Sequence, residues 1–309
     1  MRILLTGGSG MVGRNLQEHP AADKFEILAP RSQELDLLDR KAVSSYMEEK
    51  KPDLVIHAAG RVGGIQANMA DPVGFLVDNS LMGIHVINEA YKAGVEKCIN
   101  LASSCMYPRS ATNPLSEDQI LTGELEPTNE GYALAKITAT RLSQYISKVD
   151  STRKYVTLVP CNLYGKYDKF DPAHSHMIPA VIRKIHEAKM AGLSAVDIWG
   201  DGEARREFMF VADLASCVFK VIEQMRADVP LLMNVGLGKD HTINEYYRAV
   251  ADVIGFQGEF EHDLTKPVGM RQKLIDSTRV GSVGWQAKTS LREGIEQTYQ
   301  YFLKDVINE

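Results

Sequence analysis

The feature that most constrains the fold of this 309-residue chain is a group of three glycines near its N-terminus. Gly7, Gly10 and Gly13 follow the spacing G-x-x-G-x-x-G, between a short apolar run and a segment of helical period. Glycine lets the chain turn sharply, so that backbone N–H groups can approach a pyrophosphate at the positive end of the following helix. The alternative is a glycine-rich turn without a ligand. The strand–loop–helix context favours a dinucleotide site.

The rest of the N-terminal half predicts an α/β protein of the Rossmann-like, doubly wound class. Short apolar runs alternate with segments of helical period, which is typical of a parallel sheet with helices on both faces. We expect strands at 2–6, 26–29, 54–57, 97–102 and 156–160, and helices at 40–50, 74–93 and 129–148.

After about residue 165 the pattern changes, which predicts a smaller second domain. Expected helices lie at 178–190, 211–227, 243–254 and 290–304, and expected strands lie around 196–199, 207–210 and 232–235. We therefore predict a dinucleotide-binding Rossmann domain over residues 1–165, to which some later segments cross back, and an α/β substrate-binding domain over residues 166–309. No linker-like composition separates them, so we expect close packing around a cleft.

Composition excludes several classes of partner. The formal net charge is −5 and the cations are dispersed, which argues against nucleic acid. No apolar run approaches the ~20 residues of a membrane span, and residues 1–8 lead into a strand without a signal-peptide cleavage site. We therefore expect a cytoplasmic protein. The four cysteines (Cys98, Cys105, Cys161, Cys217) show no close pairing, so neither a metal site nor a disulfide framework is indicated.

The end of the second expected strand indicates which dinucleotide is bound. An acidic residue there would accept hydrogen bonds from a free ribose 2′-hydroxyl, but the chain reads Ala-Pro-Arg-Ser at 29–32. The guanidinium of Arg31 suits a 2′-phosphate, which favours NADP, although Arg31 could also be an ordinary surface residue. Asp36 and Leu37 follow where an adenine would lie, and Ala58 and Ala59 supply small side chains after the third strand.

Tyr132 and Lys136 indicate a catalytic pair. They occur as Y-A-L-A-K on an expected helix, where a spacing of four places both side chains on one face. A nearby ammonium should lower the pKa of the tyrosine and make it a better proton donor. Carbonyl reduction needs such a donor beside a hydride source. The pair is common on solvated helix faces, and it becomes specific only together with the glycine motif and Ser103.

Ser103 and Cys105 leave the carboxyl end of the expected strand at 97–102, where open α/β sheets place their ligand crevice. Side chains alternate along an extended chain, so both residues should face one side. Cys105 could also be an inert buried thiol. His176 lies in a polar loop before a helix, and we predict it as the acid partner of Cys105. Metal binding by His174 and His176 ranks low because no acidic or cysteine partner accompanies them.

These motifs resemble the extended short-chain dehydrogenases/reductases, and among them the bifunctional GDP-sugar epimerase/reductases that form GDP-L-fucose. The resemblance covers essentially the whole chain. It rests on G-M-V-G at 10–13, H-A-A-G-R-V-G-G at 57–64, S-S-C-M-Y-P at 103–108, E-P-T-N-E-G-Y-A-L-A-K at 126–136, N-L-Y-G at 162–165, H-S-H-M-I-P at 174–179 and W-G-D-G-E-A-R-R-E-F at 199–208.

The resemblance implies roles for these residues. Ser103, Tyr132 and Lys136 would reduce a C4 ketone with NADPH, while Cys105 and His176 would act as base and acid in epimerising C3 and C5. Trp199, Arg206 and Lys273 would hold the GDP-linked 4-keto-deoxy sugar, and Lys184 would approach its diphosphate. Predicted cofactor contacts are Gly7, Gly10, Met11, Val12, Gly13, Arg31, Asp36, Leu37, Ala58, Ala59, Leu101, Ala102, Lys136, Pro160, Asn162, Leu163 and His176. The family also implies a homodimer paired through helices near 74–93 and 129–148.

Some positions depart from the family pattern and leave more than one activity open. Ser9 stands where a relative has arginine, the Pro30–Ser32 segment is shifted against the family's basic cluster, and Val268 replaces an acidic residue. The same motifs also fit an enzyme that forms GDP-L-colitose from a 3,6-dideoxy ketosugar. An NAD-dependent nucleotide-sugar 4-epimerase and a non-catalytic dinucleotide sensor are compatible with the glycine motif as well, and the complete Ser/Tyr/Lys set argues against the sensor.

Overall fold

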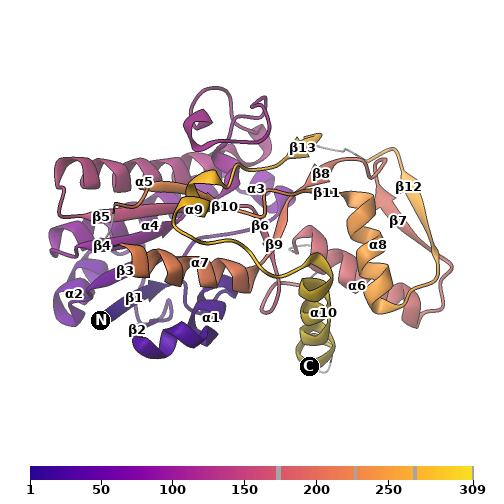
Figure 1. The fold of residues 1–309 in the computed structure, drawn as a ribbon, viewed down its shortest axis with the longest axis horizontal. Coiled ribbons are helices and arrows are strands. Elements are labelled where there is room, and N and C mark those ends of the chain that lie inside the picture. The colour runs from indigo at the N-terminus through magenta and orange to yellow at the C-terminus, as the bar shows by residue number, and fades with distance from the viewer. Residues whose placement is uncertain (172–174, 226–227, 267–269, 308–309) are drawn as a thin grey trace.

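The computed structural model describes residues 1–171, 175–225, 228–266 and 270–307. Its larger part is a six-stranded parallel sheet with strand order β10-β5-β4-β3-β1-β2 (Figure 1). The chain runs outward from β1 in both directions, which puts the topological switch point between β1 and β3. The strands are β1 (Arg2–Thr6), β2 (Glu26–Leu28), β3 (Leu54–His57), β4 (Lys97–Leu101), β5 (Lys154–Pro160) and β10 (Leu232–Val235).

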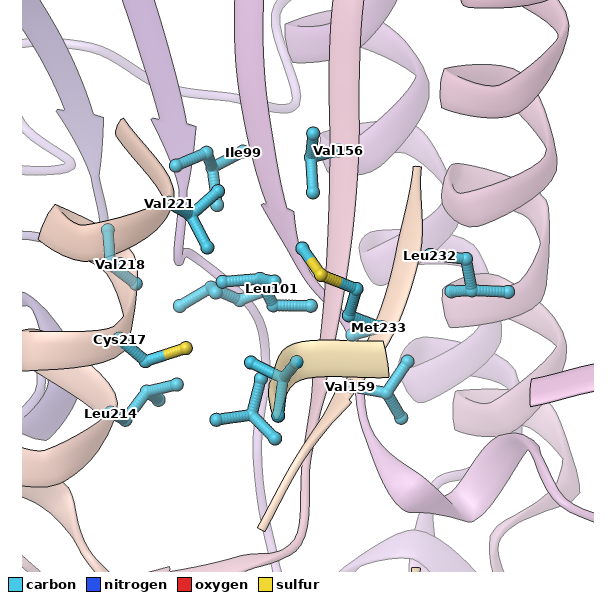
Figure 2. Packing of buried hydrophobic residues seen from close by; sticks show 14 of the residues in the cluster. Ile99, Leu101, Val156, Val159, Leu214, Cys217, Val218, Val221, Leu232 and Met233 are labelled. Carbon is cyan, nitrogen blue, oxygen red and sulfur yellow. The ribbon is translucent and has the colours of Figure 1, made fainter. Parts of the chain in front are cut away.

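Both faces of this sheet are covered by helices, which explains the near-continuous apolar runs of its strands. Leu4 and Val55 pack against α2 (Arg40–Lys50), α4 (Pro72–Lys92) and α5 (Glu130–Val149). Ile3 and Leu5, which alternate with Leu4, contribute to the core on the other face with α1 (Met11–Glu18), α7 (Val211–Gln224) and α9 (Thr278–Ser282). Figure 2 shows the α7 side chains turned toward residues of β4 and β5. A short helix, α3 (Ile65–Ala70), precedes α4.

The smaller part lies beyond the carboxyl edge of the sheet and has its own apolar core (Figure 1). Its helices are α6 (Met177–Met190), α8 (Ile243–Ile254) and α10 (Leu291–Tyr301), and a π-helical turn (Phe302–Val306) follows α10. Capping boxes at Thr242/Glu245 and Ser290/Glu293 begin α8 and α10.

Three small sheets complete the structure. β6 (Asn162–Tyr164) pairs with β9 (Phe208–Phe210), and β7 (Ala195–Trp199) pairs with β12 (Glu259–Asp263). β8 (Arg205–Arg206) lies between β11 (His241–Thr242) and β13 (Gln272–Lys273). β8 thus continues through residue 207 into β9, so the two parts share one extended segment.

The predicted fold class is confirmed: the structure is an α/β protein with a parallel central sheet. Many predicted boundaries were wrong by one to three residues, as three of them illustrate. The fourth strand stops at Leu101, the helix expected over 211–227 ends at Gln224, and the helix expected over 290–304 gives way to the π turn after Tyr301. α7 and β10, which come after residue 165, belong to the core of the larger part. Within the described ranges, no helix is both long and apolar enough to cross a membrane.

Candidate active site

The glycine loop after β1 has the geometry of a phosphate cradle. Gly7 has φ +73°, and its carbonyl accepts the N–H of Gly10 at 3.1 Å. A Cβ on Gly13 would lie 2.2 Å from the Gly7 carbonyl oxygen, so only glycine fits where the loop meets α1. The first N–H groups of α1 have no acceptor within the helix, and no acidic residue lies in its first turn. The loop can therefore receive a pyrophosphate at the helix N-terminus.

We expect Gly13→Ala to weaken dinucleotide binding by about tenfold or more and to lower Tm, because the added methyl group must push the loop off the helix. Fluorescence titration with NADPH and thermal denaturation measure both effects. The matched control is Gly281→Ala in α9, where an added Cβ meets no atom within 4 Å. Equal NADPH affinity of the Gly13→Ala and Gly281→Ala proteins would rule out this loop as the cradle.

The other predicted cofactor residues follow neighbouring strands at the same edge of the sheet. Ala58 and Ala59 come directly after β3, and a Cβ on Gly7 would lie 2.7 Å from the Ala59 nitrogen. Leu101 ends β4 and Ala102 follows it, Pro160 ends β5, and Asn162 and Leu163 lie on β6. Fold and spacing thus bring these residues to the carboxyl edge, beside the switch point.

The predicted adenosine end lies beyond β2. Arg31 is exposed, and its N–H donates to the Glu34 carboxylate at 2.7 Å. Within the described residues its guanidinium has no salt bridge, so it is free to meet an anion. The Asp36 carboxylate accepts the N–H of Leu38 at 2.9 Å, and the Leu37 carbonyl oxygen lies 3.0 Å from the Nδ1 of His85. Asp36 therefore stabilises a turn as well as standing at the predicted site.

Lys136 is buried on α5 and faces the carboxyl end of β4. Its Nζ donates to the Leu101 carbonyl at 2.9 Å. Burial lowers the pKa of Lys136 to about 8, and the negative charge of a Cys105 thiolate opposes this shift. A Cβ on Gly60 would lie 3.6 Å from Nζ, so the ammonium also lies beside the loop that follows β3. Lys136 therefore joins the reactive residues to the predicted cofactor edge.

Tyr132 lies one turn before Lys136, as the spacing predicts, but the predicted electrostatics were wrong. Burial, followed by the charge of Cys105, raises the pKa of Tyr132 far above its usual value. The Lys136 Nζ lies 5.7 Å from the centre of the Tyr132 ring, and its hydrogen bond goes to Leu101. Burial therefore keeps Tyr132 as a neutral phenol in the protein alone.

His57 and Thr6 form a buried pair beneath this site that the sequence reasoning missed. The His57 Nδ1 and the Thr6 Oγ1 are 2.8 Å apart. Burial, assisted by the positive charge of Lys136, lowers the pKa of His57 to about 3, so the ring is neutral at neutral pH. The available signal was a polar residue at the carboxyl end of each of two adjacent strands, β1 and β3.

Ser103 and Cys105 lie together, but not for the predicted reason. Residues 104–106 form a 3-10 helix and not an extended segment, so strand alternation does not apply. Ser103 is the N-cap, and its Oγ accepts the N–H of Cys105 at 3.4 Å. Burial raises the pKa of the Cys105 thiol, whereas Lys273, the Ser103 hydrogen bond and Lys136 lower it. Burial outweighs the two cations, so their positive charges only partly offset the cost of forming a thiolate at this position.

Arg206 and Lys273 are two partly buried cations of the second part, and Lys273 acts on Cys105. They face each other across β8 and β13 in parallel register. Burial lowers the pKa of each, and Lys273 also interacts with Cys105, Arg206 and Glu126. Over the described residues, neither cation forms a salt bridge with a carboxylate. Two desolvated, unneutralised cations form a site for an anionic ligand.

The remaining predicted substrate residues are less enclosed. Trp199 is 53% exposed at the end of β7. Lys184 forms a salt bridge with Asp197 at 2.7 Å, which competes with the predicted diphosphate contact. The structure therefore groups Lys273, and through it Arg206, with Cys105, whereas Trp199 ends β7 and Lys184 on α6 is paired with Asp197 of β7.

His176 is the N-cap of α6, and burial followed by the charge of Lys169 lowers its pKa. The positive charges that lower the pKa of Cys105 are those of Lys273 and Lys136. The pKa values of His176 and Cys105 are therefore influenced by different lysines. His174 and Val268 lie outside the described residues. Among the described side chains, no group of three or more His, Cys, Asp or Glu is arranged to hold a metal.

Comparison with known proteins identifies the family. Residues 3–236 match the model of the NAD dependent epimerase/dehydratase family, which is well over half of the chain. The chain belongs to this family. The predicted resemblance to the extended short-chain dehydrogenases/reductases is therefore confirmed.

Three similar proteins are named as synthases of GDP-linked sugars. A GDP-L-colitose synthase of Yersinia pseudotuberculosis is 53% identical over the full length of both chains. A GDP-L-fucose synthase of Azorhizobium caulinodans is 51% identical over 98% of this chain and 96% of its own. A GDP-D-glycero-L-gluco-heptose synthase from Campylobacter jejuni, solved in the presence of NADPH, superposes with a TM-score of 0.90 at 28% identity, covering 98% of both chains.

Proposed function

We propose that this chain is a bifunctional GDP-sugar epimerase/reductase, which converts GDP-4-keto-6-deoxy-D-mannose to GDP-L-fucose with NADPH. The observation that carries the proposal is the convergence of two reactive sets at one edge of the sheet. Tyr132 and Lys136 serve a reduction, and Cys105 with Ser103 serves proton transfer. Relatives at 51–53% identity named for GDP-L-fucose and GDP-L-colitose synthesis support this proposal.

The glycine cradle, the small residues after β3 and the exposed guanidinium of Arg31 fit NADPH. When bound, NADPH supplies the hydride for the C4 carbon. Ser103 donates a hydrogen bond to the C4 carbonyl oxygen, and Tyr132 donates the proton that this oxygen gains. Lys136 keeps positive charge beside Tyr132 and thereby favours loss of that proton. Carbonyl, hydride and proton together give the C4 alcohol and NADP⁺.

Epimerisation precedes the reduction, because only the ketone acidifies the protons at C3 and C5. The Cys105 thiolate removes such a proton, and the resulting enolate is stabilised by the hydrogen bond from Ser103. His176 returns a proton to the opposite face of the carbon. Arg206 and Lys273 bind the diphosphate. Trp199 and Lys184 lie nearer to the end of the diphosphate that faces solvent. No electron is exchanged in this stage, so NADPH is consumed only once per turnover.

The experiment that tests the proposal is product identification by NMR. Incubation with GDP-4-keto-6-deoxy-D-mannose and NADPH should consume one NADPH per sugar and yield GDP-L-fucose, with a slower rate for NADH. The 53% relative favours a second candidate, formation of GDP-L-colitose from the corresponding 3,6-dideoxy ketosugar, and that substrate is tested in parallel. Turnover without added reductant, by protein that copurifies with NAD, would instead identify a 4-epimerase.

We further propose that the enzyme is a cytoplasmic homodimer paired through α4 and α5. These helices pack side by side and leave apolar side chains at helical spacing on their outer surfaces. On α4 the exposed residues are Val73, Leu76, Val77 and Leu81, and on α5 they are Leu134, Tyr145 and Val149. A second copy presenting the same two helices would bury this surface in a two-fold symmetric, four-helix interface.

Val77→Arg is expected to convert the dimer to a monomer, because each copy would place a guanidinium in the apolar interface. Light scattering at several protein concentrations measures the mass. Leu264→Arg is the matched control, since Leu264 is 74% exposed on the opposite part of the molecule. A wild-type protein that is monomeric at all concentrations would refute the dimer.

A further inference from the structure

Glu207 is a buried carboxylate to which the proposed reaction assigns no role. It lies between β8 and β9 and is 1% exposed. Its Oε1 accepts the N–H of Leu237 at 2.6 Å and that of Gly238 at 2.9 Å, and its Oε2 accepts the N–H of Ile275 at 3.0 Å. Three backbone N–H groups thus occupy acceptor sites on both oxygens of this one carboxylate.

These three contacts connect segments that are far apart in sequence. Leu237 and Gly238 follow β10, the edge strand of the large sheet, and Ile275 follows β13. The backbone carbonyl of Glu207 also accepts a hydrogen bond from Asn162 Nδ2 at 2.9 Å. Glu207 therefore joins β8–β9 to the carboxyl edge of the large sheet and to the strand that carries Lys273.

The space around the carboxylate is shaped for it. A Cβ on Gly236 would lie 2.4 Å from Oε1, so glycine at this position leaves room for the side chain. Burial raises the pKa of Glu207 to about 7 against the lowering effect of the three N–H donors. The charged group that acts on it is Asp240, not a cation. Glu207 is thus held by backbone dipoles and leaves the positive charges of Arg206 and Lys273 free.

We propose that Glu207 is a positioning residue that sets the two diphosphate-binding cations. Arg206 precedes it in the chain, and Lys273 lies two residues before its hydrogen-bond partner Ile275. By holding both segments, Glu207 keeps β8 and β13 in register, so that the two cations face the same anion. Adjacent side chains on an extended strand point to opposite sides, which lets Glu207 anchor the backbone while Arg206 faces the site. This inference rests on the GDP-sugar binding proposed above.

Glu207→Gln tests the inference because it replaces one acceptor oxygen by an NH₂ group. That group cannot accept a hydrogen bond from the backbone N–H groups of Leu237, Gly238 or Ile275. Calorimetry should show GDP binding weakened by about tenfold or more, with affinity for NADPH and for guanosine, which lacks the diphosphate, within twofold of wild type. In turnover, KM for the GDP-ketosugar should rise while kcat changes little. Glu223→Gln, at an exposed position on α7, is the matched control.

A double-mutant cycle distinguishes positioning from a general loss of packing. In the Arg206→Ala/Lys273→Ala background, Glu207→Gln should have almost no further effect on GDP affinity, because the cations through which it acts are gone. An undiminished effect in that background would overturn the inference, and so would equal loss of NADPH and GDP binding in the single variant. If Glu207→Gln does not fold, Gly236→Ala provides a second variant, since its methyl group displaces the same carboxylate.

The failure of this inference differs from failure of the proposed function. A wild-type protein that binds neither GDP nor a GDP-sugar would refute the proposed substrate, and the inference with it. A wild-type protein that binds GDP, together with a folded Glu207→Gln variant that binds it equally well, would overturn only the role of Glu207.

Discussion

Replacing Tyr132 with phenylalanine should reduce NADPH oxidation by about 10²–10⁴-fold, the usual contribution of a positioned general acid. The C4 oxygen would then lack its proton donor, while the proton-transfer site at Cys105 keeps its side chain. The initial rate of absorbance loss at 340 nm measures the reduction. Exchange of the C3 and C5 protons with D₂O, followed by NMR, should persist in this variant.

A control variant and two contrary outcomes decide how the Tyr132→Phe result is interpreted. Tyr46→Phe, at a half-buried position on α2 away from the site, should reduce neither rate by more than about twofold. A Tyr132→Phe enzyme that keeps a tenth or more of the wild-type reduction rate would exclude Tyr132 as the proton donor. A matching loss of deuterium exchange would instead show that the substitution disrupts the whole site.

Cys105→Ser is the second substitution with a large expected effect, and it should act on the other half of the reaction. A serine hydroxyl does not ionise near neutral pH, so Lys273 and Lys136 would have no thiolate to stabilise. Deuterium incorporation at C3 and C5 should fall by about 10²-fold or more. The residual NADPH consumption should yield a sugar that is reduced at C4 without inversion at its neighbours.

Cys217→Ser is the matched control, because Cys217 is an equally buried thiol on α7. It is expected to lower Tm slightly while leaving deuterium exchange unaffected. Normal exchange in Cys105→Ser would remove Cys105 from the role of base, and the two-stage reaction would need another proton acceptor.

These two variants separate activities whose residues share electrostatic surroundings. Cys105 raises the pKa of Tyr132 and opposes the lowering of the pKa of Lys136. A thiolate at Cys105 therefore makes Tyr132 a poorer proton donor and Lys136 a more persistent cation. This coupling agrees with the proposed order of steps: once the Cys105 thiolate has taken a proton its charge is gone, and it no longer raises the pKa of Tyr132.

Local features of the sequence determined where several residues of the candidate site lie relative to one another. The i,i+4 spacing of Tyr132 and Lys136, the two-residue step from Ser103 to Cys105, and the glycine spacing each place groups within one or two turns of backbone. Such placements depend on helix and loop geometry that a few neighbouring residues specify. The fold class was predictable for the same reason, because alternating periods along the chain indicate alternating strands and helices.

Even local inference was wrong where a competing interaction was not visible. The segment after Ala102 looks extended, yet the Ser103 hydroxyl caps a 3-10 turn over 104–106. Cys105 still lies beside Ser103, through the cap and not through strand alternation. The effect of Lys136 on the pKa of Tyr132 was also predicted without knowing that these side chains are buried. Burial raises the pKa of Tyr132, which is opposite to the predicted direction.

Tertiary structure alone decided which distant residues share the site. Lys136 donates to Leu101, Lys273 acts on Cys105, and Glu207 accepts N–H groups from residues 30 or more positions away. A sequence motif identifies such residues as candidates, but burial and charge depend on every segment packed around them. The glycine loop was therefore determined by the sequence itself, because backbone sterics act over a few residues. The electrostatics of Cys105, Tyr132 and Lys136 were decided only by packing, because desolvation and Coulomb interactions act between residues that the fold brings together.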